Sequence, residues 1–416
     1  MASAESGTPI TRVPWYRRLS RWRQTSHKEA VAAERALLDL CRTPTQTTDV
    51  PVGPRPDEFM HTIHARDPPA AAPALVAVPG YAAGSGHAFR IVDGLAAAFR
   101  FYAVDLLGTG LSGRPPFRAK STDEAVAFFV DSLETWRQKQ GLDKMLLMGH
   151  SLGGYLSACY ASKYPERVQH LLLVSPAGVG RRPSEWEPSR LPSAWSLRGA
   201  LARFLIWSWD SDLTPGRVIR GLGPLGPGLV QRYARGRFQQ GLALSDAEVA
   251  RFESYFYHIL VARGSGEFAL RHILAPFAWP RQALEERCAD LQVPVTIFYG
   301  DVDWMEPRSG GRYGAMLREK RGVLAEHDTE TITTPKAGHY LFMDNPSAFL
   351  KQVAEVTRQY LPADALQRLL DAAAQAGAPL GAPFHPPDAL EEQPEREASF
   401  ASEGGRPNTA PNTAPQ

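Results

Sequence analysis

The stretch Met148-Gly149-His150-Ser151-Leu152-Gly153-Gly154 decides how this chain folds. It follows the apolar run 145–148 and precedes residues 155–164, whose pattern suits a helix. A serine between small residues, at the passage from a buried strand to a helix, is typical of a strained turn that projects the hydroxyl at the end of the strand. The pattern predicts that Ser151 is a nucleophile; a glycine-rich turn with an inactive serine is the alternative.

Short apolar runs and helical patterns alternate on both sides of this stretch. Buried strands separated by helices are typical of an α/β protein with a doubly wound, mostly parallel sheet. Each run ends in glycine, proline, aspartate or serine, which places loops at the carboxyl ends of the strands, where such sheets bind ligands. The expected strands are 74–78, 101–104, 145–148, 171–174 and 295–299.

A serine hydroxyl needs a base to take its proton, and a carboxylate commonly orients that base. His339 is the predicted base because it lies on a late loop, between a strand-like stretch and a helical one. Two aspartates follow the strand 295–299 and compete for the role of the acid. We favour Asp303, three residues beyond Gly300, over Asp301; the other carboxylate would cap a helix or accept a hydrogen bond in a turn.

Acyl transfer also requires hydrogen-bond donors for the negative charge that develops on the carbonyl oxygen. The expected donors are the backbone amides of Leu152, directly after the nucleophile, and of Tyr81, in the loop after strand 74–78. In that loop Pro79 occupies a place where a histidine is common, which leaves the backbone donors unchanged. The sequence predicts no cofactor and no metal site.

Composition excludes several classes of protein. The 46 lysines and arginines are balanced by 44 acidic residues, so no bulk positive field would hold a nucleic acid. The three cysteines Cys41, Cys159 and Cys288 are far apart and lack metal-ligand spacing, which favours a reducing compartment. No stretch approaches the roughly 18 apolar residues of a membrane span. We expect a cytoplasmic protein that contacts membranes or lipid droplets peripherally, with a mitochondrial location as the alternative.

The alternation of strands and helices is interrupted once. Residues 51–175 and 291–362 would form the two parts of a catalytic core, and residues 176–290 a helical lid inserted over the sheet. The alternative for this segment is a helical subdomain whose tryptophans pack its own core. The tryptophans in question are Trp186, Trp195, Trp207, Trp209 and Trp279.

The two ends of the chain differ from the core. Within residues 1–50, Trp15, Leu19 and Trp22 recur at helical spacing with arginines between them, which suits an amphipathic helix on a membrane or droplet surface. Docking of this helix on the catalytic core is the alternative. Residues 363–416 drift toward alanine, proline, glutamate and glycine, so we assign them to a mostly disordered tail, with disorder expected from roughly residue 375.

Longer motifs carry a resemblance to a known family. Val104-Asp105-Leu106-Leu107-Gly108-Thr109-Gly110-Leu111-Ser112-Gly113-Arg114-Pro115 is similar to the second-strand loop of α/β-hydrolases, and residues 128–137 narrow the field. The stretches 214–224, 264–267 and 299–305 resemble one branch of that family. The branch contains α/β-hydrolase-domain proteins four and five, the fungal cardiolipin-specific deacylase and plant lysophosphatidic acid acyltransferase-like proteins.

This resemblance implies an α/β-hydrolase fold with an inserted lid and a role in phospholipid and neutral lipid homeostasis. The leading interpretation is a serine ester hydrolase of the phospholipase or lysophospholipase type. The alternatives are a lysophosphatidic acid acyltransferase that makes phosphatidic acid, and a non-catalytic coactivator of a partner lipase. Ser151 favours catalysis, because the coactivator member of the branch lacks the nucleophile.

The branch also has a His-x-x-x-x-Asp pattern that is linked to acyl transfer. His339 and Asp344 match it in this sequence. His339 is already the predicted base of Ser151, and Asp344 has an alternative role as the cap of a helix that begins near Pro346. The residues do not separate water from a lipid alcohol as the acyl acceptor.

Overall fold

The structure is a computed structural model that describes residues 25–68, 72–182, 213–238 and 244–377, together with Ser196, Arg203 and Trp209. These residues belong to the first of two compact units, residues 1–381. The aromatic N-terminal helix predicted around Trp15, the lid tryptophans Trp186, Trp195 and Trp207, and the tail beyond residue 377 lie outside the described residues.

An eight-stranded sheet organises the described part of the chain, with the strand order β1-β2-β4-β3-β5-β6-β7-β8. The strands from β3 to β8 are parallel, and all five predicted strands are among them. The six parallel strands are β3 (Ala74–Val78), β4 (Arg100–Val104), β5 (Met145–His150), β6 (Val168–Val174), β7 (Val295–Gly300) and β8 (Glu330–Thr334). The doubly wound, mostly parallel sheet is thereby confirmed.

The strand order reverses at β3, which pairs with β4 on one side and with β5 on the other. In open parallel sheets, ligands bind at the carboxyl ends of the strands where the order reverses. The loop after β3 carries Tyr81 and the turn after β5 carries Ser151. The topology therefore brings these two predicted site residues to the same place.

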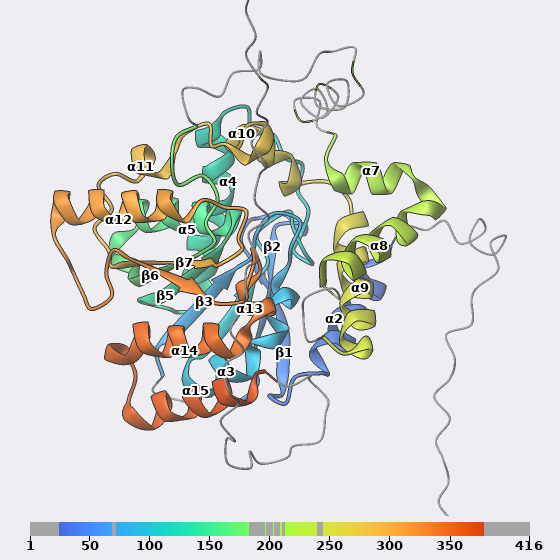
Figure 1. The fold of residues 1–416 in the computed structure, drawn as a ribbon. Helices are drawn as coiled ribbons and strands as arrows, with labels where there is room; N and C mark the ends of the chain where they lie inside the picture. Colours follow the sequence, from blue (N-terminus) through green and yellow to red (C-terminus); the bar gives the residue numbers. More distant parts are fainter. Residues whose placement is uncertain are drawn as a thin grey trace, which may run out of the picture. The chain divides into compact units, whose positions relative to one another are not determined.

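Helices cover both faces of the sheet (Figure 1). Successive side chains of β3 enter opposite cores, Leu75 and Ala77 on one face and Ala74, Val76 and Val78 on the other, as the two-residue period of a strand requires. The first core is closed by α3 (Val92–Ala98), α14 (Pro346–Thr357) and α15 (Ala363–Gln375), and the second by α4 (Thr122–Lys139), α5 (Leu152–Lys163) and α12 (Pro307–Arg321).

Two strands precede those that the sequence predicts. β1 (Thr45–Pro51) and β2 (Phe59–Ala65) pair with each other and with β4 in antiparallel fashion, so the predicted boundary at residue 50 cuts through β1. β1 is a polar edge strand of which Val50 alone is buried, and β2 buries the polar side chains His61 and Thr62. Neither strand is an apolar run, which is why the hydrophobic pattern missed them.

The core also extends beyond the boundary placed at residue 362. Residues 363–375, the first part of the tail and before the point near residue 375 where disorder was expected to begin, form α15 and pack against α3 and α14. Ala365, Leu369 and Ala373 are buried at a spacing of four residues, so one narrow stripe of this helix closes the core. An overall drift in composition hid this short amphipathic segment.

The described part of the inserted lid is helical. Its described helices are α7 (Pro215–Gly221), α8 (Gly226–Phe238), α9 (Asp246–Val261), α10 (Leu270–Ile273) and α11 (Leu284–Arg287), and a 3-10 turn, η4 (Gly223–Leu225), joins α7 to α8. α9 packs against α2 (His27–Leu38) at the edge of the core. Tyr255 and Glu248 of α9 are fully buried, and Glu248 faces Arg90 at 3.8 Å. α9 is therefore anchored in the core, and α7 and α8 pack against α9, with Ile219, Val230 and Ala234 in the same cluster of buried residues (Figure 1).

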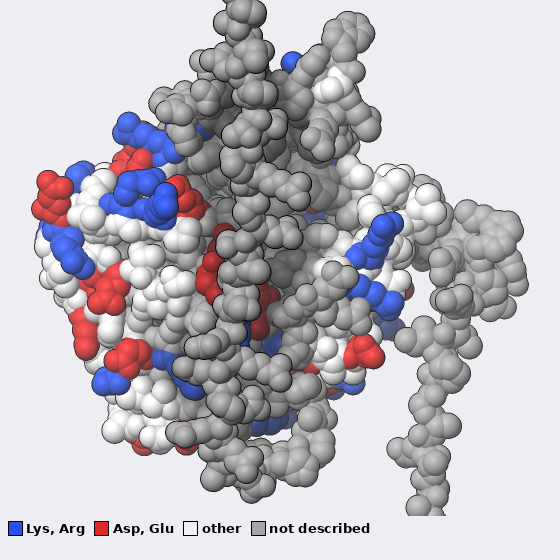
Figure 2. All heavy atoms as spheres, in the orientation of Figure 1, with Lys and Arg blue, Asp and Glu red and all other residues white. Residues whose placement is uncertain are grey.

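Charged side chains of both signs are interspersed over the face formed by α12 and α14 (Figure 2). This mixture follows from the near balance of 46 basic and 44 acidic residues. Within the described part of the chain, none of the helices combines the length and the apolar character that crossing a bilayer requires.

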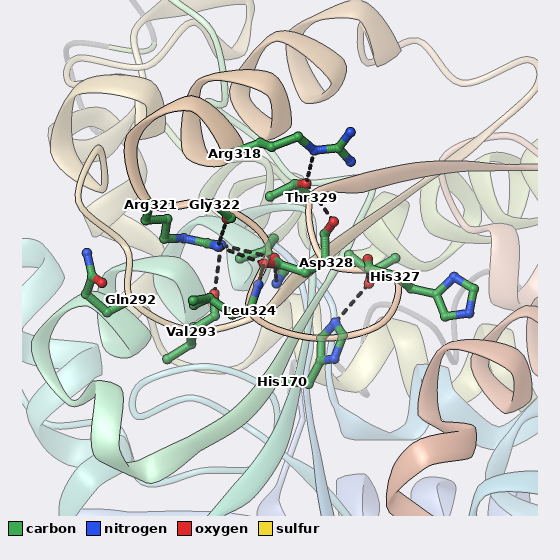
Figure 3. A network of polar contacts seen from close by, with 12 residues as sticks. His170, Gln292, Val293, Arg318, Arg321, Gly322, Leu324, His327, Asp328 and Thr329 are labelled. Atoms are coloured by element: carbon green, nitrogen blue, oxygen red, sulfur yellow. Dashed lines mark hydrogen bonds and ion pairs between the residues drawn. The ribbon is translucent and has the colours of Figure 1, made fainter.

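A buried polar network fixes the connection between α12 and β8 (Figure 3). The Asp328 carboxylate accepts hydrogen bonds from both terminal nitrogens of Arg321, at 2.7 and 3.0 Å, and from the amides of Val295 and Leu324. Burial opposes ionisation of Asp328, but these bonds outweigh it and lower the pKa of the carboxyl. The network joins the starts of β7 and β8, the two strands whose following loops carry Asp303 and His339.

A second buried network ties β2 to α2. Both ring nitrogens of His61 face carboxylates, Nε2 at 2.7 Å from Glu34 and Nδ1 at 2.6 Å from Asp49. Burial disfavours the imidazolium, but the hydrogen bonds to Asp49 and Glu34 outweigh it and raise the pKa of His61 to about 10. Burial also raises the pKa of Glu34. The charged imidazole is therefore part of the folded structure.

We expect His61→Ala to lower the free energy of unfolding by about 3 kcal/mol or more, because it leaves Glu34 buried without its cation. Because the pKa of His61 is raised on folding, its contribution is complete below about pH 6.5 and is lost as the pH rises through about 10. Urea unfolding between pH 6 and 10 measures both effects. The control is His64→Ala, a half-buried histidine on the same strand; equal losses for the two variants would contradict the prediction.

Candidate active site

Ser151 lies in a sharp turn between β5 and α5. Its backbone has a φ of +53°, in the left-handed region that non-glycine residues rarely adopt. The neighbouring glycines leave no room for a side chain: a Cβ on Gly149 would lie 2.5 Å from the carbonyl oxygen of Gly153, and one on Gly153 would lie 2.3 Å from that of Pro79. The Gly-x-Ser-x-Gly spacing is thus required by the close approach of β3, β5 and α5.

His339 lies in the loop between β8 and α13 (Leu341–Asp344) and is largely buried. Its Nε2 atom is 3.0 Å from the Ser151 hydroxyl oxygen. Its backbone carbonyl accepts a hydrogen bond from Nε2 of His150, at 2.9 Å. The residue before the serine therefore holds the histidine loop against the turn, a contact that the sequence pattern did not reveal.

The two aspartates after β7 have different contacts. Oδ1 of Asp303 is 3.2 Å from Nδ1 of His339, and the Asp303 side chain is completely buried. Burial opposes ionisation of Asp303, but its bond with His339 helps to outweigh this and lower the pKa of the carboxyl. The exposed Asp301 accepts the backbone amides of Ala337 and Lys336, at 2.9 and 2.8 Å, and these bonds lower its pKa. The structure places Asp303, and not Asp301, against His339.

The two predicted backbone donors lie beside the serine. Leu152 is the first residue of α5, where helix amides have no partner within the helix and the dipole favours negative charge. The loop that carries Tyr81 passes so close to the nucleophile that a Cβ on Gly80 would lie 2.9 Å from the Cβ of Ser151. Tyr81, Leu152 and Ser151 line the same cavity. Both loops therefore border the Ser151 side chain.

A cavity of about 990 Å³ opens onto Ser151 and His339. Its size lies at the upper end of the usual range for small-molecule sites, about 300 to 1,000 Å³. Most of its wall is apolar and comes from the lid and from the loop after β7. Representative lining residues are Leu213, Ile219, Leu229, Leu274, Trp304 and Met305.

Sequence reasoning missed most of this wall. Trp304 directly follows Asp303, and its ring centroid lies 5.1 Å from that of His339. Thr214 and Glu267 also line the cavity, and the Thr214 hydroxyl donates to the Glu267 carboxylate at 2.7 Å. Both lie in stretches that the family resemblance singled out without giving them a role. That resemblance was the one signal in the sequence that marked them.

Asp344 supports the histidine loop and does not cap the helix that begins at Pro346. Its carboxylate accepts the backbone amide of Gly338 at 2.7 Å, so it holds the loop directly before His339. The side chain that caps α14 is that of Asn345, which accepts the amide of Ala348 at 3.1 Å. The helix-capping alternative for Asp344 was therefore wrong. Asp344 is also absent from the cavity wall among the described residues.

Comparisons with known proteins identify the family and several relatives. Residues 73–346 match the family described as alpha/beta hydrolase fold. The probable 1-acylglycerol-3-phosphate O-acyltransferase of Oryza sativa subsp. japonica is 40% identical over 364 residues, which cover 83% of this chain and 84% of the rice protein. The (lyso)-N-acylphosphatidylethanolamine lipase of Homo sapiens is 36% identical over 284 residues, 68% of this chain and 78% of the human protein.

Among solved structures, carboxylesterase CesB of Bacillus subtilis is similar with a TM-score of 0.54 and covers 79% of this chain and 97% of its own. At 17% identity this similarity shows the fold alone. The family match and the two sequence relatives show the family as well as the fold, because they span most of the described core. The chain therefore belongs to the alpha/beta hydrolase family, in the branch that includes these acyltransferase-named and lipase-named relatives.

Proposed function

We propose that this protein is a lipid acyl hydrolase of the phospholipase or lysophospholipase type, acting in phospholipid and neutral lipid homeostasis. One observation carries the proposal: Ser151, His339 and Asp303 form a continuous chain of contacts, at 3.0 and 3.2 Å, that opens into a large apolar cavity. Such a cavity suits an acyl chain, since burial stabilises it by about 0.8 kcal/mol per methylene.

In the proposed reaction, Nε2 of His339 takes the hydroxyl proton while the Ser151 oxygen attacks the ester carbonyl. Asp303 holds the ring and stabilises the imidazolium through Nδ1. The amides of Leu152 and Tyr81 would donate to the oxyanion. As the intermediate collapses, His339 returns the proton to the leaving alcohol, which leaves an acyl ester on Ser151. Water, deprotonated by His339, then releases the fatty acid and restores the serine.

A second candidate is an acyltransferase in which a lipid hydroxyl replaces water in the last step. The rice relative favours it, because that protein is named as a 1-acylglycerol-3-phosphate O-acyltransferase. The His339 and Asp344 pattern adds little, because Asp344 supports the Gly338 amide and does not line the cavity. The acceptor would therefore be activated by His339 in either reaction.

Product analysis separates these candidates. One sample of the purified protein is labelled with a fluorophosphonate, and a separate, unlabelled sample is given an acyl donor with and without lysophosphatidic acid. Free fatty acid in both samples supports hydrolysis, and phosphatidic acid formed at the expense of fatty acid supports transfer. A protein that shows neither labelling nor product but stimulates a separate lipase would be a coactivator, and the proposal of catalysis would then be wrong.

We predict that catalytic efficiency rises with acyl length. Each methylene buried in the cavity is expected to raise kcat/KM by up to about fourfold, until the cavity is filled. Remote chain binding would also position the carbonyl against Ser151, so short substrates should lose kcat as well as affinity. Initial rates on monomeric esters of increasing length measure this dependence. A flat profile would leave the serine site in place but remove the lipid assignment.

A further inference from the structure

The outer surface of the lid exposes large apolar side chains. Five of them lie within the short segment formed by α7, η4 and α8, the most exposed being Leu225, whose exposed fraction is 72%. We name this surface the lid face. Its apolar members are Val218, Leu222, Leu225, Leu229 and Tyr233.

The same helices are also apolar on the side that faces the protein. Ile219, Val230 and Ala234 are buried, and the ring of Tyr233 stacks on that of Phe256 in α9 at a centroid distance of 5.9 Å. A helix that is apolar on both sides is usually covered on both sides. The lid face is therefore an apolar surface that lacks a cover among the described residues.

The lid face is continuous with the wall of the cavity. Val218, Leu229 and Tyr233 are exposed to solvent and also line the cavity. Trp304, from the separate loop after β7, likewise lines the cavity while 63% exposed. Apolar side chains thus border the opening through which a long acyl chain would enter.

The charge of this segment is one-sided. Residues 213–238 contain five arginines and neither aspartate nor glutamate. Arg220 and Arg235 bond to glutamates elsewhere, whereas the side chains of Arg217 and Arg232 are exposed. Figure 2 shows blue side chains beside uncharged surface over α7 and α8. An apolar surface with basic residues complements a bilayer that contains anionic phospholipid.

We propose that the lid face docks on a bilayer containing anionic phospholipid, with the leucines in the acyl region and Arg217 and Arg232 at the phosphates. This proposal rests on the proposed function, since it supplies the route by which a lipid substrate passes from the bilayer to Ser151. Association through the surface that borders the cavity keeps the acyl chain in apolar surroundings along its path. A protein partner would not require the surface to be continuous with the cavity.

Vesicle flotation tests the apolar part of the proposal. We expect Leu222→Ser/Leu225→Ser to weaken partitioning of the full chain onto phosphatidylcholine–phosphatidylserine vesicles by about tenfold or more. Neither residue lines the cavity, so the rate on a short soluble ester should stay unchanged. The matched control is Val323→Ser/Leu324→Ser, two exposed apolar residues in the connection between α12 and β8. The control should float like the unaltered protein.

The charge part has its own test. Arg217→Gln/Arg232→Gln should remove most of the gain that phosphatidylserine gives over phosphatidylcholine alone, at about 1 kcal/mol per basic residue near an anionic surface, or roughly fivefold for each arginine. The control is Lys139→Gln/Lys144→Gln, which removes two exposed charges, one at the end of α4 and one directly before β5. Equal loss in both variants would show a general charge effect and overturn the assignment to the lid face.

Other anchors give distinguishable results. If both lid-face variants float normally and Trp15→Ser/Trp22→Ser does not, the N-terminal segment is the anchor and the proposal is wrong. If the lid face instead mediates self-association, sedimentation would show a dimer that Leu222→Ser/Leu225→Ser dissociates, without flotation of either protein. Flotation is also measured on Ser151→Ala. If the unaltered protein and Ser151→Ala both float but the unaltered protein hydrolyses no lipid, the proposed function is rejected and the proposal of a docking surface remains valid.

Discussion

Replacing Ser151 with alanine is expected to abolish covalent labelling by a fluorophosphonate and to lower the rate of ester hydrolysis by about 10⁴-fold or more. The reason is geometric: the Ser151 oxygen is the atom that lies 3.0 Å from Nε2 of His339, and both residues line the cavity. Members of such a triad act as a unit, so the remaining residues retain little of the rate. Labelling and initial rates on a soluble ester measure both effects.

The loss must be separated from unfolding. Ser132→Ala is a matched control, because Ser132 is a buried serine in α4 whose hydroxyl donates to the carbonyl of Phe129 and which does not line the cavity. Both variants should unfold within a few degrees of the unaltered protein, since each loses only a hydroxyl group. Full labelling of Ser151→Ala would move the nucleophile to another serine and leave the proposed mechanism without its first step.

The central sheet could be predicted because its strands are buried on both faces. β3, β5 and β7 are buried at every residue, so each one reads as an apolar run that a helix follows. β1 and β2 could not be found this way. β1 is mostly exposed. β2 buries His61, a polar residue in the sequence whose positive charge is balanced in the fold by the carboxylates of Glu34 and Asp49.

The candidate site could be predicted from the sequence only in part. Ser151 and His339 lie at the carboxyl ends of strands, in positions that the chain order of the fold sets, and the structure brings their side chains together. The cavity wall comes from lid segments without periodic or catalytic patterns, such as those of Thr214 and Glu267. Their contact joins residues 53 positions apart, and only the fold determines such a contact.

The choice between the two aspartates leads to the last prediction. We expect Asp303→Asn to lower kcat by about 10³- to 10⁴-fold, because a carboxamide cannot stabilise the imidazolium of His339 through Nδ1. Asp301→Asn should cost no more than about tenfold. Asp301 holds the histidine loop by accepting two backbone amides, and the carboxamide oxygen of asparagine can still accept one of them.

The same pair of variants separates a chemical role from a structural one. Asp301 is exposed and accepts the backbone amides of Lys336 and Ala337, so its substitution should disturb the position of His339 and affect substrates of every acyl length alike. Asp303 contacts the ring itself, so its loss should lower kcat with little change in KM. Steady-state kinetics on soluble esters of short and long acyl chains, with thermal unfolding as the check on folding, decides between them. A larger loss of kcat for Asp301→Asn than for Asp303→Asn would assign the acid to Asp301 and require the histidine loop to adopt a different position during turnover.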